Sequence, residues 1–255
     1  MPAVLTSRDN ARVKRWARLA AESKFRRNER RTLIEGPHLL AALLGQGMKP
    51  VAVIVTEEAL EKEEVRTLAG DSPVLVSKGV FRSIVDAENP PGIAAEIAIP
   101  KRNQRGDAQV FLEGVQDPSN VGAIIRSAAA FGIGRIVLDA ACADPWSPKA
   151  LRAGMGGHFS LRIDDTKAFA DELKSFEGTL VCTVPKGGIS LRKLSSEKPL
   201  GWIFGAEGKG VSPQAAHHAN IRVTIPMSSG TESLNVAAAA AICLYEAFSR
   251  PAAGS

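Results

Sequence analysis

The chain has 255 residues, 45% of them hydrophobic and 23% charged, a balance typical of a globular protein with one or two domains. The most apolar stretch, residues 234–248, contains Glu246 and is shorter than the roughly 20 residues that a membrane-spanning helix needs. The N-terminus carries charges where a secretory signal has its apolar core. We therefore expect a cytoplasmic protein without a membrane segment.

Cysteine and histidine positions give no sign of a metal centre. Cys142, Cys182 and Cys243 are far apart, and the four histidines form no pair at metal-ligand spacing. An odd, scattered set of cysteines also argues against a disulfide framework. We expect small core residues in a reducing compartment and no bound metal.

Positive charge is concentrated in the first 31 residues. This segment has a net charge of +7, whereas the remaining chain has −2. Such a local excess favours binding to a polyanion. It is equally typical of a solvated, charged helix face, so charge alone does not identify RNA as the partner.

The first hundred residues predict a small α/β unit. Apolar residues at helical spacing and strand-like runs indicate its elements in chain order. We expect helices over residues 11–21 and 37–44, followed by strands over 51–56, 74–77 and 93–97.

A polar, charged segment at residues 99–109 is predicted as a linker. Beyond it a strand, a helix and a second strand indicate the start of a parallel sheet with a right-handed connection. We expect strands over residues 110–113, 135–138, 180–184, 201–204 and 222–225, and helices over 121–131 and 233–248.

The connection between the strand at 110–113 and its helix carries the first candidate residues. Ser119 or Asn120 can cap the helix. Arg126 interrupts an otherwise apolar, alanine-rich helix, so its guanidinium needs an anion or a carboxylate. An internal ion pair with a residue such as Glu113 would make Arg126 structural.

Two later strands also run into polar loops. The strand at 201–204 enters a loop dense in glycine, where backbone N–H groups can approach a ligand closely. Glu207 in this loop is either a ligand acceptor or a solvated carboxylate. The last strand leads to a helix with Ser233 and Asn235 at its mouth, which suits a cap or a polar ligand group.

Three stretches in this order, DPSNVGAIIRSAAAFGIGRIVL, IFGAEGKGVS and IPMSSGTESLNVAAAAAICLYE, resemble the SpoU/TrmH family of RNA 2′-O-ribose methyltransferases. The resemblance implies an α/β fold: a trefoil-knotted parallel-sheet methyltransferase domain over residues 107–252. A small α/β RNA substrate-binding domain, similar to a ribosomal protein fold, would precede it over residues 1–100. The resemblance also implies S-adenosylmethionine as cofactor, and a homodimer with the site at the interface.

The resemblance transfers roles to individual residues. The catalytic set is Arg126, Asn120, Glu207, Ser233 and Asn235. The cofactor-binding set is Thr183, Val184, Pro185, Gly205, Ala206, Glu207, Ile225, Pro226, Met227, Ser233, Leu234 and Asn235. The resemblance and the basic N-terminal segment together predict an RNA-binding set of Arg8, Arg12, Arg15, Arg26, Arg27, Arg30 and Arg152. One departure is the stretch RAGMGG, where Gly154 replaces a serine common in relatives and weakens inference about RNA contacts near Arg152.

Methyl transfer from a sulfonium needs no metal, so positioning and desolvation should supply most of the acceleration. A ribose hydroxyl needs hydrogen bonding or proton removal in the transition state. The family proposal gives this role to Arg126. A guanidinium is not normally deprotonated, so we expect Arg126 to clamp the adjacent phosphate and stabilise the developing alkoxide, while phosphate or water takes the proton.

We expect Asn120 to orient the arginine and the substrate, Glu207 to help fix the site, and Ser233 and Asn235 to shape the cofactor pocket. One alternative is a catalytically silent RNA-binding protein with the same fold, and another is a methyltransferase acting on protein or small molecules. The intact motif residues favour an enzyme and the basic N-terminal segment favours RNA, with ribosomal and transfer RNA both open.

Overall fold

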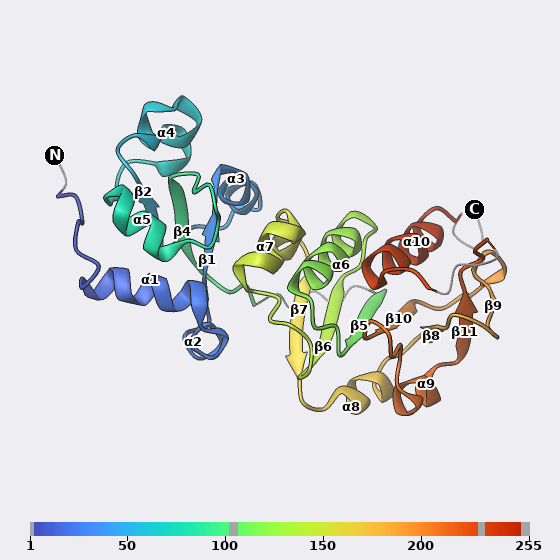
Figure 1. Cartoon of the computed structure of the whole chain (residues 1–255). Coiled ribbons are helices and arrows are strands. Elements are labelled where there is room, and N and C mark those ends of the chain that lie inside the picture. The colour runs from blue at the N-terminus through green and yellow to red at the C-terminus, as the bar shows by residue number, and fades with distance from the viewer. Residues whose placement is uncertain (1–2, 102–106, 229–232, 251–255) are drawn as a thin grey trace. The chain divides into compact units, whose positions relative to one another are not determined.

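The computed structural model describes residues 3–101, 107–228 and 233–250, and its chain forms two compact units (Figure 1). The first unit contains residues 1–101 and 144–159, and the second contains residues 102–143 and 160–255. The sequence-based boundaries placed residues 144–159 in the second domain. Their contacts lie in the first unit instead, so the second unit is interrupted in sequence.

The first unit is built on a four-stranded sheet in the order β1-β4-β2-β3. Its strands are β1 (Arg31–Glu35), β2 (Ala52–Val55), β3 (Val74–Leu75) and β4 (Ile93–Ala98). Its helices are α1 (Ala11–Ala21), α2 (Ser23–Glu29), α3 (Pro37–Gly45), α4 (Glu63–Ala69), α5 (Lys78–Ile84) and α7 (Pro148–Gly154), with 3-10 turns at Ala59–Glu61 and Gly157–Phe159. β4 pairs antiparallel with both β1 and β2.

Helix α1 forms where its sequence predicts it. The side chain of Asn10 accepts a hydrogen bond from the backbone N–H of Arg12 and so caps the helix. Val13, Trp16 and Leu19 recur at helical spacing and are buried against the sheet and α5. The basic residues of the helix are therefore left on its other faces.

Polar contacts join residues 144–159 to the rest of the first unit. The hydroxyl of Thr32 donates a hydrogen bond to the carbonyl of Trp146 at 2.8 Å. Arg152, on α7, pairs with Glu35 at 3.3 Å and with Asp86 at 2.7 Å. Burial raises the pKa of Glu35 above its ordinary value.

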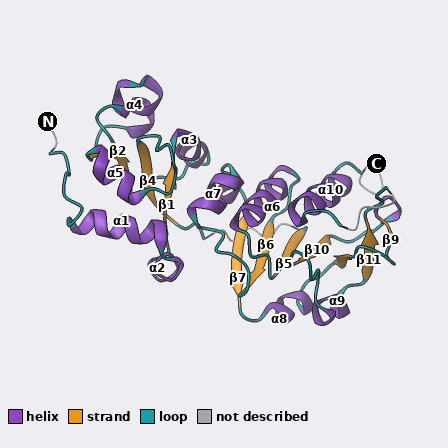
Figure 2. Ribbon diagram, in the orientation of Figure 1, coloured by secondary structure: helices purple, strands orange, loops and turns teal. Residues whose placement is uncertain are grey.

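The second unit is a seven-stranded sheet in the order β7-β6-β5-β10-β8-β11-β9, in which every pair is parallel (Figure 2). Its strands are β5 (Gln109–Glu113), β6 (Arg135–Asp139), β7 (Arg162–Thr166), β8 (Thr179–Thr183), β9 (Ile189–Ser190), β10 (Leu200–Gly205) and β11 (Ile221–Thr224). Its helices are α6 (Pro118–Ala130), α8 (Phe169–Lys174), α9 (Pro213–His218) and α10 (Val236–Phe248), with a 3-10 turn at Leu191–Lys193. This confirms the predicted parallel α/β sheet.

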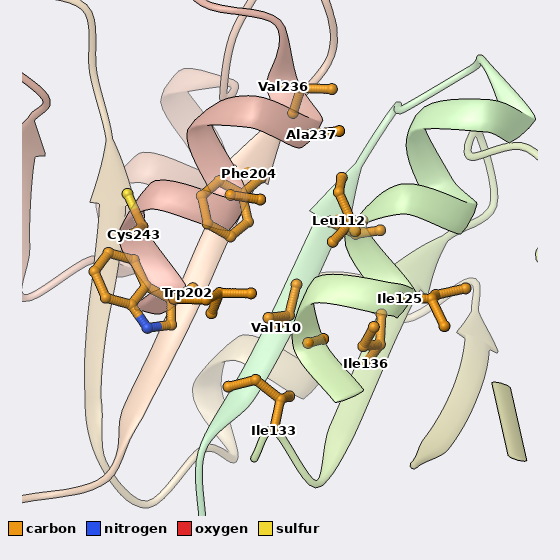
Figure 3. Packing of buried hydrophobic residues seen from close by; sticks show 14 of the residues in the cluster. Val110, Leu112, Ile125, Ile133, Ile136, Trp202, Phe204, Val236, Ala237 and Cys243 are labelled. Carbon is orange, nitrogen blue, oxygen red and sulfur yellow. The ribbon is translucent and has the colours of Figure 1, made fainter. Parts of the chain in front are cut away.

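Helices cover both faces of this sheet (Figures 1 and 2). Val110 and Leu112 of β5 pack in the core beneath α6 and α10, as Figure 3 shows. Phe111, between them in sequence, packs in a separate cluster with residues of α8 and α9. Because alternate residues face opposite layers, both sets are apolar, as in parallel strands buried on two sides.

Strand order in the second unit reverses at β5. The chain continues from β5 to β6 and β7 in one direction, whereas β10 and β8 extend the sheet in the other. Ligands of open parallel sheets bind beyond the carboxyl ends of the strands near such a reversal. Among the described helices, none has the length and apolar character needed to cross a membrane.

His158 is a buried titratable group of the first unit. Its Nε2–H donates to the carbonyl of Pro145 at 2.7 Å, and within the described residues its Nδ1 has no hydrogen-bond partner. Burial lowers the pKa of His158 to about 4. The folded protein therefore keeps this imidazole neutral at pH values where the unfolded chain would protonate it.

We predict that the protein loses stability as the pH falls from about 6.5, the ordinary histidine pKa, towards the lowered value of about 4. In this window the unfolded state binds more protons than the folded state, so acid favours unfolding. Urea unfolding followed by tryptophan fluorescence should show a smaller loss across this window for His158→Gln, which keeps an amide donor. Identical pH dependence for the two proteins would contradict this role.

Candidate active site

The loops that follow β8, β10 and β11, together with the start of α10, enclose a cavity of about 360 Å³. It is lined by Thr183, Val184, Pro185, Phe204, Gly205, Ala206, Glu207, Gly208, Gly210, Val211, Ile225, Met227, Ser233, Leu234, Asn235, Val236 and Ala239. Every residue of the cofactor-binding set predicted from the sequence lies in this lining except Pro226. The loops after three strands and the start of α10 thus meet at one end of the sheet.

The glycine-rich loop after β10 turns back on itself beside the cavity. The N–H of Gly210 donates to the carbonyl of Ala206 at 2.8 Å. A Cβ atom at Gly205 would lie 2.1 Å from the carbonyl carbon of Gly210 and 2.2 Å from the nitrogen of Val211. Only glycine fits at this close approach of backbone to backbone, so Gly205 fixes the shape of this wall.

A chain of hydrogen bonds joins three of the predicted catalytic residues. The amide nitrogen of Asn235 donates to the side-chain oxygen of Asn120 at 3.1 Å. The amide nitrogen of Asn120 donates in turn to the Glu207 carboxylate at 2.5 Å. Asn120 thereby connects the start of α6 to the glycine-rich loop and to the start of α10.

Asn235, rather than Ser233, caps the last helix. Its side-chain oxygen accepts hydrogen bonds from the N–H groups of Ala237 and Ala238 at 2.9 and 3.2 Å. The predicted start of this helix at residue 233 was therefore early, because α10 begins at Val236. Ser233 and Leu234 are exposed and non-helical, and both line the cavity.

Arg126 lies apart from the cavity of its own chain. It is exposed on α6, does not line the cavity, and makes no hydrogen bond or ion pair within the described residues. The proposed internal partner, Glu113, instead accepts hydrogen bonds from the backbone N–H and hydroxyl of Ser212, at 2.8 and 2.6 Å. Within the described residues, therefore, neither Glu113 nor another carboxylate forms the internal ion pair that would make Arg126 structural.

Several arginines of the predicted RNA-binding set have structural partners. Arg26 is 3% exposed, pairs with Asp144 at 2.8 Å, and donates to the carbonyls of Leu19 and Ala20. Burial of this guanidinium contradicts its assignment as an RNA contact. Arg152 is held by its two carboxylates in the first unit, which accounts for it without RNA.

The other basic candidates are more accessible. Arg8, Arg12, Arg27 and Arg30 are exposed, whereas Arg15 is partly buried and pairs with Glu29 and Glu96. Arg8 donates to the carbonyl of Gly79 at 3.4 Å. RNA contact by these five residues stays a prediction.

The sequence did not single out several lining residues as cofactor contacts, among them Phe204, Gly208, Gly210 and Val211. The density of glycine after β10 was the available signal for two of them. The cavity has the size of a small-molecule site, for which roughly 300 Å³ is the lower bound. Among the described residues, no group of three or more histidine, cysteine, aspartate or glutamate side chains could hold a metal ion.

Comparison with known proteins agrees with this architecture. The model of the SpoU rRNA Methylase family matches residues 107–245, and that of an MRM3-like substrate binding domain matches residues 10–95. A tRNA/rRNA methyltransferase of Synechocystis, described as uncharacterized, is 35% identical over 96% of this chain and 93% of its own length. The 23S rRNA (guanosine(2553)-2′-O)-methyltransferase of Bacillus subtilis is 30% identical over 94% of this chain and 97% of its own length.

Solved structures give the same result. The AdoMet-bound rRNA methyltransferase of Sinorhizobium meliloti is 28% identical, covers 96% of this chain and 97% of its own, and superimposes with a TM-score of 0.80. The match extends over both units of the chain. The chain belongs to the SpoU rRNA methylase family.

Proposed function

We propose that the protein transfers a methyl group from S-adenosylmethionine to a ribose 2′-hydroxyl of ribosomal or transfer RNA. The observation that carries the proposal is the cavity beyond β8, β10 and β11, joined through Asn120 to the first helix of the second unit. The Bacillus subtilis relative, matched over nearly its whole length, is named for this reaction on 23S rRNA.

The cavity residues suit S-adenosylmethionine. Val184, Ile225, Met227 and Leu234 supply apolar lining, as an adenine ring or a methylene chain requires. Backbone groups of the loop after Gly205 can approach the ligand closely because that loop is glycine-rich. When bound, this cofactor supplies an electrophilic methyl group on a positively charged sulfur.

Asn120 and Glu207 are assigned to positioning. The bond from Asn120 occupies one oxygen of Glu207, and no other hydrogen bond to this carboxylate is made within the described residues. The second oxygen can therefore accept from a ribose hydroxyl or from the cofactor. A side chain whose orientation is already fixed loses less entropy on binding and holds the reacting groups in line.

We assign Arg126 to the RNA phosphate next to the reactive ribose. A planar guanidinium with free donors binds phosphate through two parallel hydrogen bonds and lowers the cost of the developing alkoxide. Since Arg126 does not line the cavity of its own chain, it would act on the cavity of a second copy. For this reason we propose a homodimer in which each active site contains residues of both chains.

An exposed apolar surface on the second unit supports the homodimer. Tyr245 and Phe248, on α10, are 58% and 61% exposed, and Ile242 on the same helix is 40% exposed. Phe131, just after α6, contacts Tyr245 and Phe248 at ring-centroid distances of 5.7 and 5.8 Å. A second copy that covers α6 and α10 would bury this surface and bring its own Arg126 near the cavity.

Three further assignments follow from the same resemblance. The loops around the cavity would form the trefoil knot of the family, and the first unit would bind the RNA substrate, in agreement with the substrate-binding model that it matches. A cytoplasmic location is consistent with relatives that are named for ribosomal and transfer RNA. The alternative is a catalytically silent RNA-binding protein. Detection of methyl transfer to RNA by the purified protein would exclude this alternative.

Gly205→Ala should lower the affinity for S-adenosylmethionine by more than about tenfold, because the new methyl group displaces the backbone at Gly210. Isothermal titration calorimetry measures this directly. Gly45→Ala is the matched control, since a Cβ there meets nothing within 4 Å. Equal affinity for the two variants would show that the glycine-rich loop is not part of the cofactor site.

Arg126→Lys should reduce methyl transfer from tritiated S-adenosylmethionine to total RNA by about a hundredfold or more, because an ammonium cannot replace the planar fork. Cofactor affinity should be unchanged, since Arg126 does not line the cavity. Label that survives RNase treatment would indicate another acceptor. Turnover near that of the unsubstituted protein would remove Arg126 from the mechanism.

A further inference from the structure

A second cavity, of about 330 Å³, lies in the first unit between α1 and the sheet. Its lining contains three arginines, Arg12, Arg15 and Arg31, and one carboxylate, Glu96. Arg12 and Arg15 come from α1, Arg31 begins β1, and Glu96 lies in β4. Cations therefore outnumber the carboxylate in this lining, and they come from two elements, α1 and β1.

Glu96 is at the centre of this arrangement. It pairs with Leu33 of β1 on one side and with Ala52 of β2 on the other, so it lies in the interior of the sheet. Its side chain is 6% exposed. A carboxylate buried to this degree needs charged or hydrogen-bonding partners.

Its partners are the cations of the cavity and one indole. One Glu96 oxygen accepts from Arg15, at 3.2 and 3.1 Å, and from Arg31, at 3.2 Å. The other accepts from the Nε1–H of Trp16 at 2.9 Å. Glu96 thus holds two guanidinium groups in fixed positions at the edge of the cavity, where their side chains remain 32% and 33% exposed.

Arg12 completes the set. Its guanidinium lies over the Trp16 ring at 5.2 Å from the centroid and makes no hydrogen bond or ion pair within the described residues. Among the described residues, Arg31 donates only one N–H, to Glu96, although a guanidinium group has five N–H donors. Arg12 and Arg31 therefore keep N–H donors that no acceptor among the described residues uses, whereas Arg15 is also paired with Glu29 at 2.6 Å.

We infer that a backbone phosphate of the substrate RNA binds in the cavity lined by Arg12, Arg15 and Arg31, which we call the Arg12 cavity. Guanidinium groups with free, preorganised donors match the oxygens of a phosphodiester. Trp16 is 1% exposed and cannot stack on a base, so the contact is with the backbone and independent of sequence. Glu96 is the positioning residue. The inference rests on the proposed function, because it takes RNA as the substrate.

The test compares two substitutions on the same helix. Arg12→Gln removes a charge from the cavity, whereas Lys14→Gln removes a charge that pairs with Asp9 outside it. Binding of in vitro transcribed 23S rRNA should weaken by about threefold to tenfold for Arg12→Gln, and the slope of log affinity against log salt should fall by about one. Lys14→Gln should bind as the unsubstituted protein does. Equal binding by the two variants would overturn the inference.

Glu96→Gln tests the positioning role. Removing a negative charge would strengthen RNA binding if only net charge mattered. Loss of the carboxylate that orders Arg15 and Arg31 should weaken it, with a smaller salt slope, and circular dichroism checks that the fold persists. Tighter binding by Glu96→Gln would contradict the positioning role.

Turnover separates this inference from the proposed function. Arg12→Gln should raise the KM for RNA while kcat and the affinity for S-adenosylmethionine stay unchanged, because Arg12 belongs to the first unit and the residues of the cofactor cavity belong to the second. If the unsubstituted protein methylates RNA and Arg12→Gln has the same KM, the inferred phosphate binding in the Arg12 cavity is wrong and the assignment as a methyltransferase stands. Failure of the unsubstituted protein to bind RNA would overturn both.

Discussion

The two hydrogen bonds of the Asn120 side chain are the contacts on which the candidate active site depends. They connect the start of α6 to Glu207 in the glycine-rich loop and to Asn235, which caps α10. Segments separated by about a hundred residues are thereby fixed around one cavity. Arg126, six residues further along α6, is exposed and does not line this cavity, in agreement with a spacing of about 1.7 helical turns, which places it on a different side of the helix from Asn120. We propose that one helix serves two sites, its own through Asn120 and that of a second copy through Arg126.

Two arginines of the first unit have structural roles, and we infer that a separate group of arginines in the same unit binds RNA. Arg26 pairs with Asp144 and donates hydrogen bonds to two backbone carbonyls, and Arg152 pairs with Glu35 and Asp86. Both belong to contacts that join residues 144–159 to the rest of the unit. The Arg12 cavity differs because its carboxylate is outnumbered by guanidinium groups that keep free donors.

Much of the second unit was predictable from sequence because its signals are local. Short apolar runs indicated β5, β6, β8, β10 and β11. The polar loops after β10 and β11 indicated two walls of the cavity, and the wall after β8 was predicted only through the family resemblance. Contacts between distant residues carry no such signal. Arg26 appeared as one more cation of a basic segment, although its partner Asp144 is 118 residues away. Residues 31–35 were not predicted as a strand because charged residues begin and end the run, yet Glu35 is buried by Arg152 and α7. The role of Glu113 likewise depends on Ser212, 99 residues away.

The proposal that α6 serves two sites is tested most directly by mixed dimers. Chains with Gly205→Ala and Arg126→Ala would be co-expressed with different tags, and the mixed dimer purified and assayed for methyl transfer. One complete site would remain, so about half of the original activity is expected. A dimer of the doubly substituted chain with an unsubstituted chain should be nearly inactive. The opposite pattern, an inactive first dimer and a half-active second one, would show that each chain uses its own Arg126 and would contradict the account.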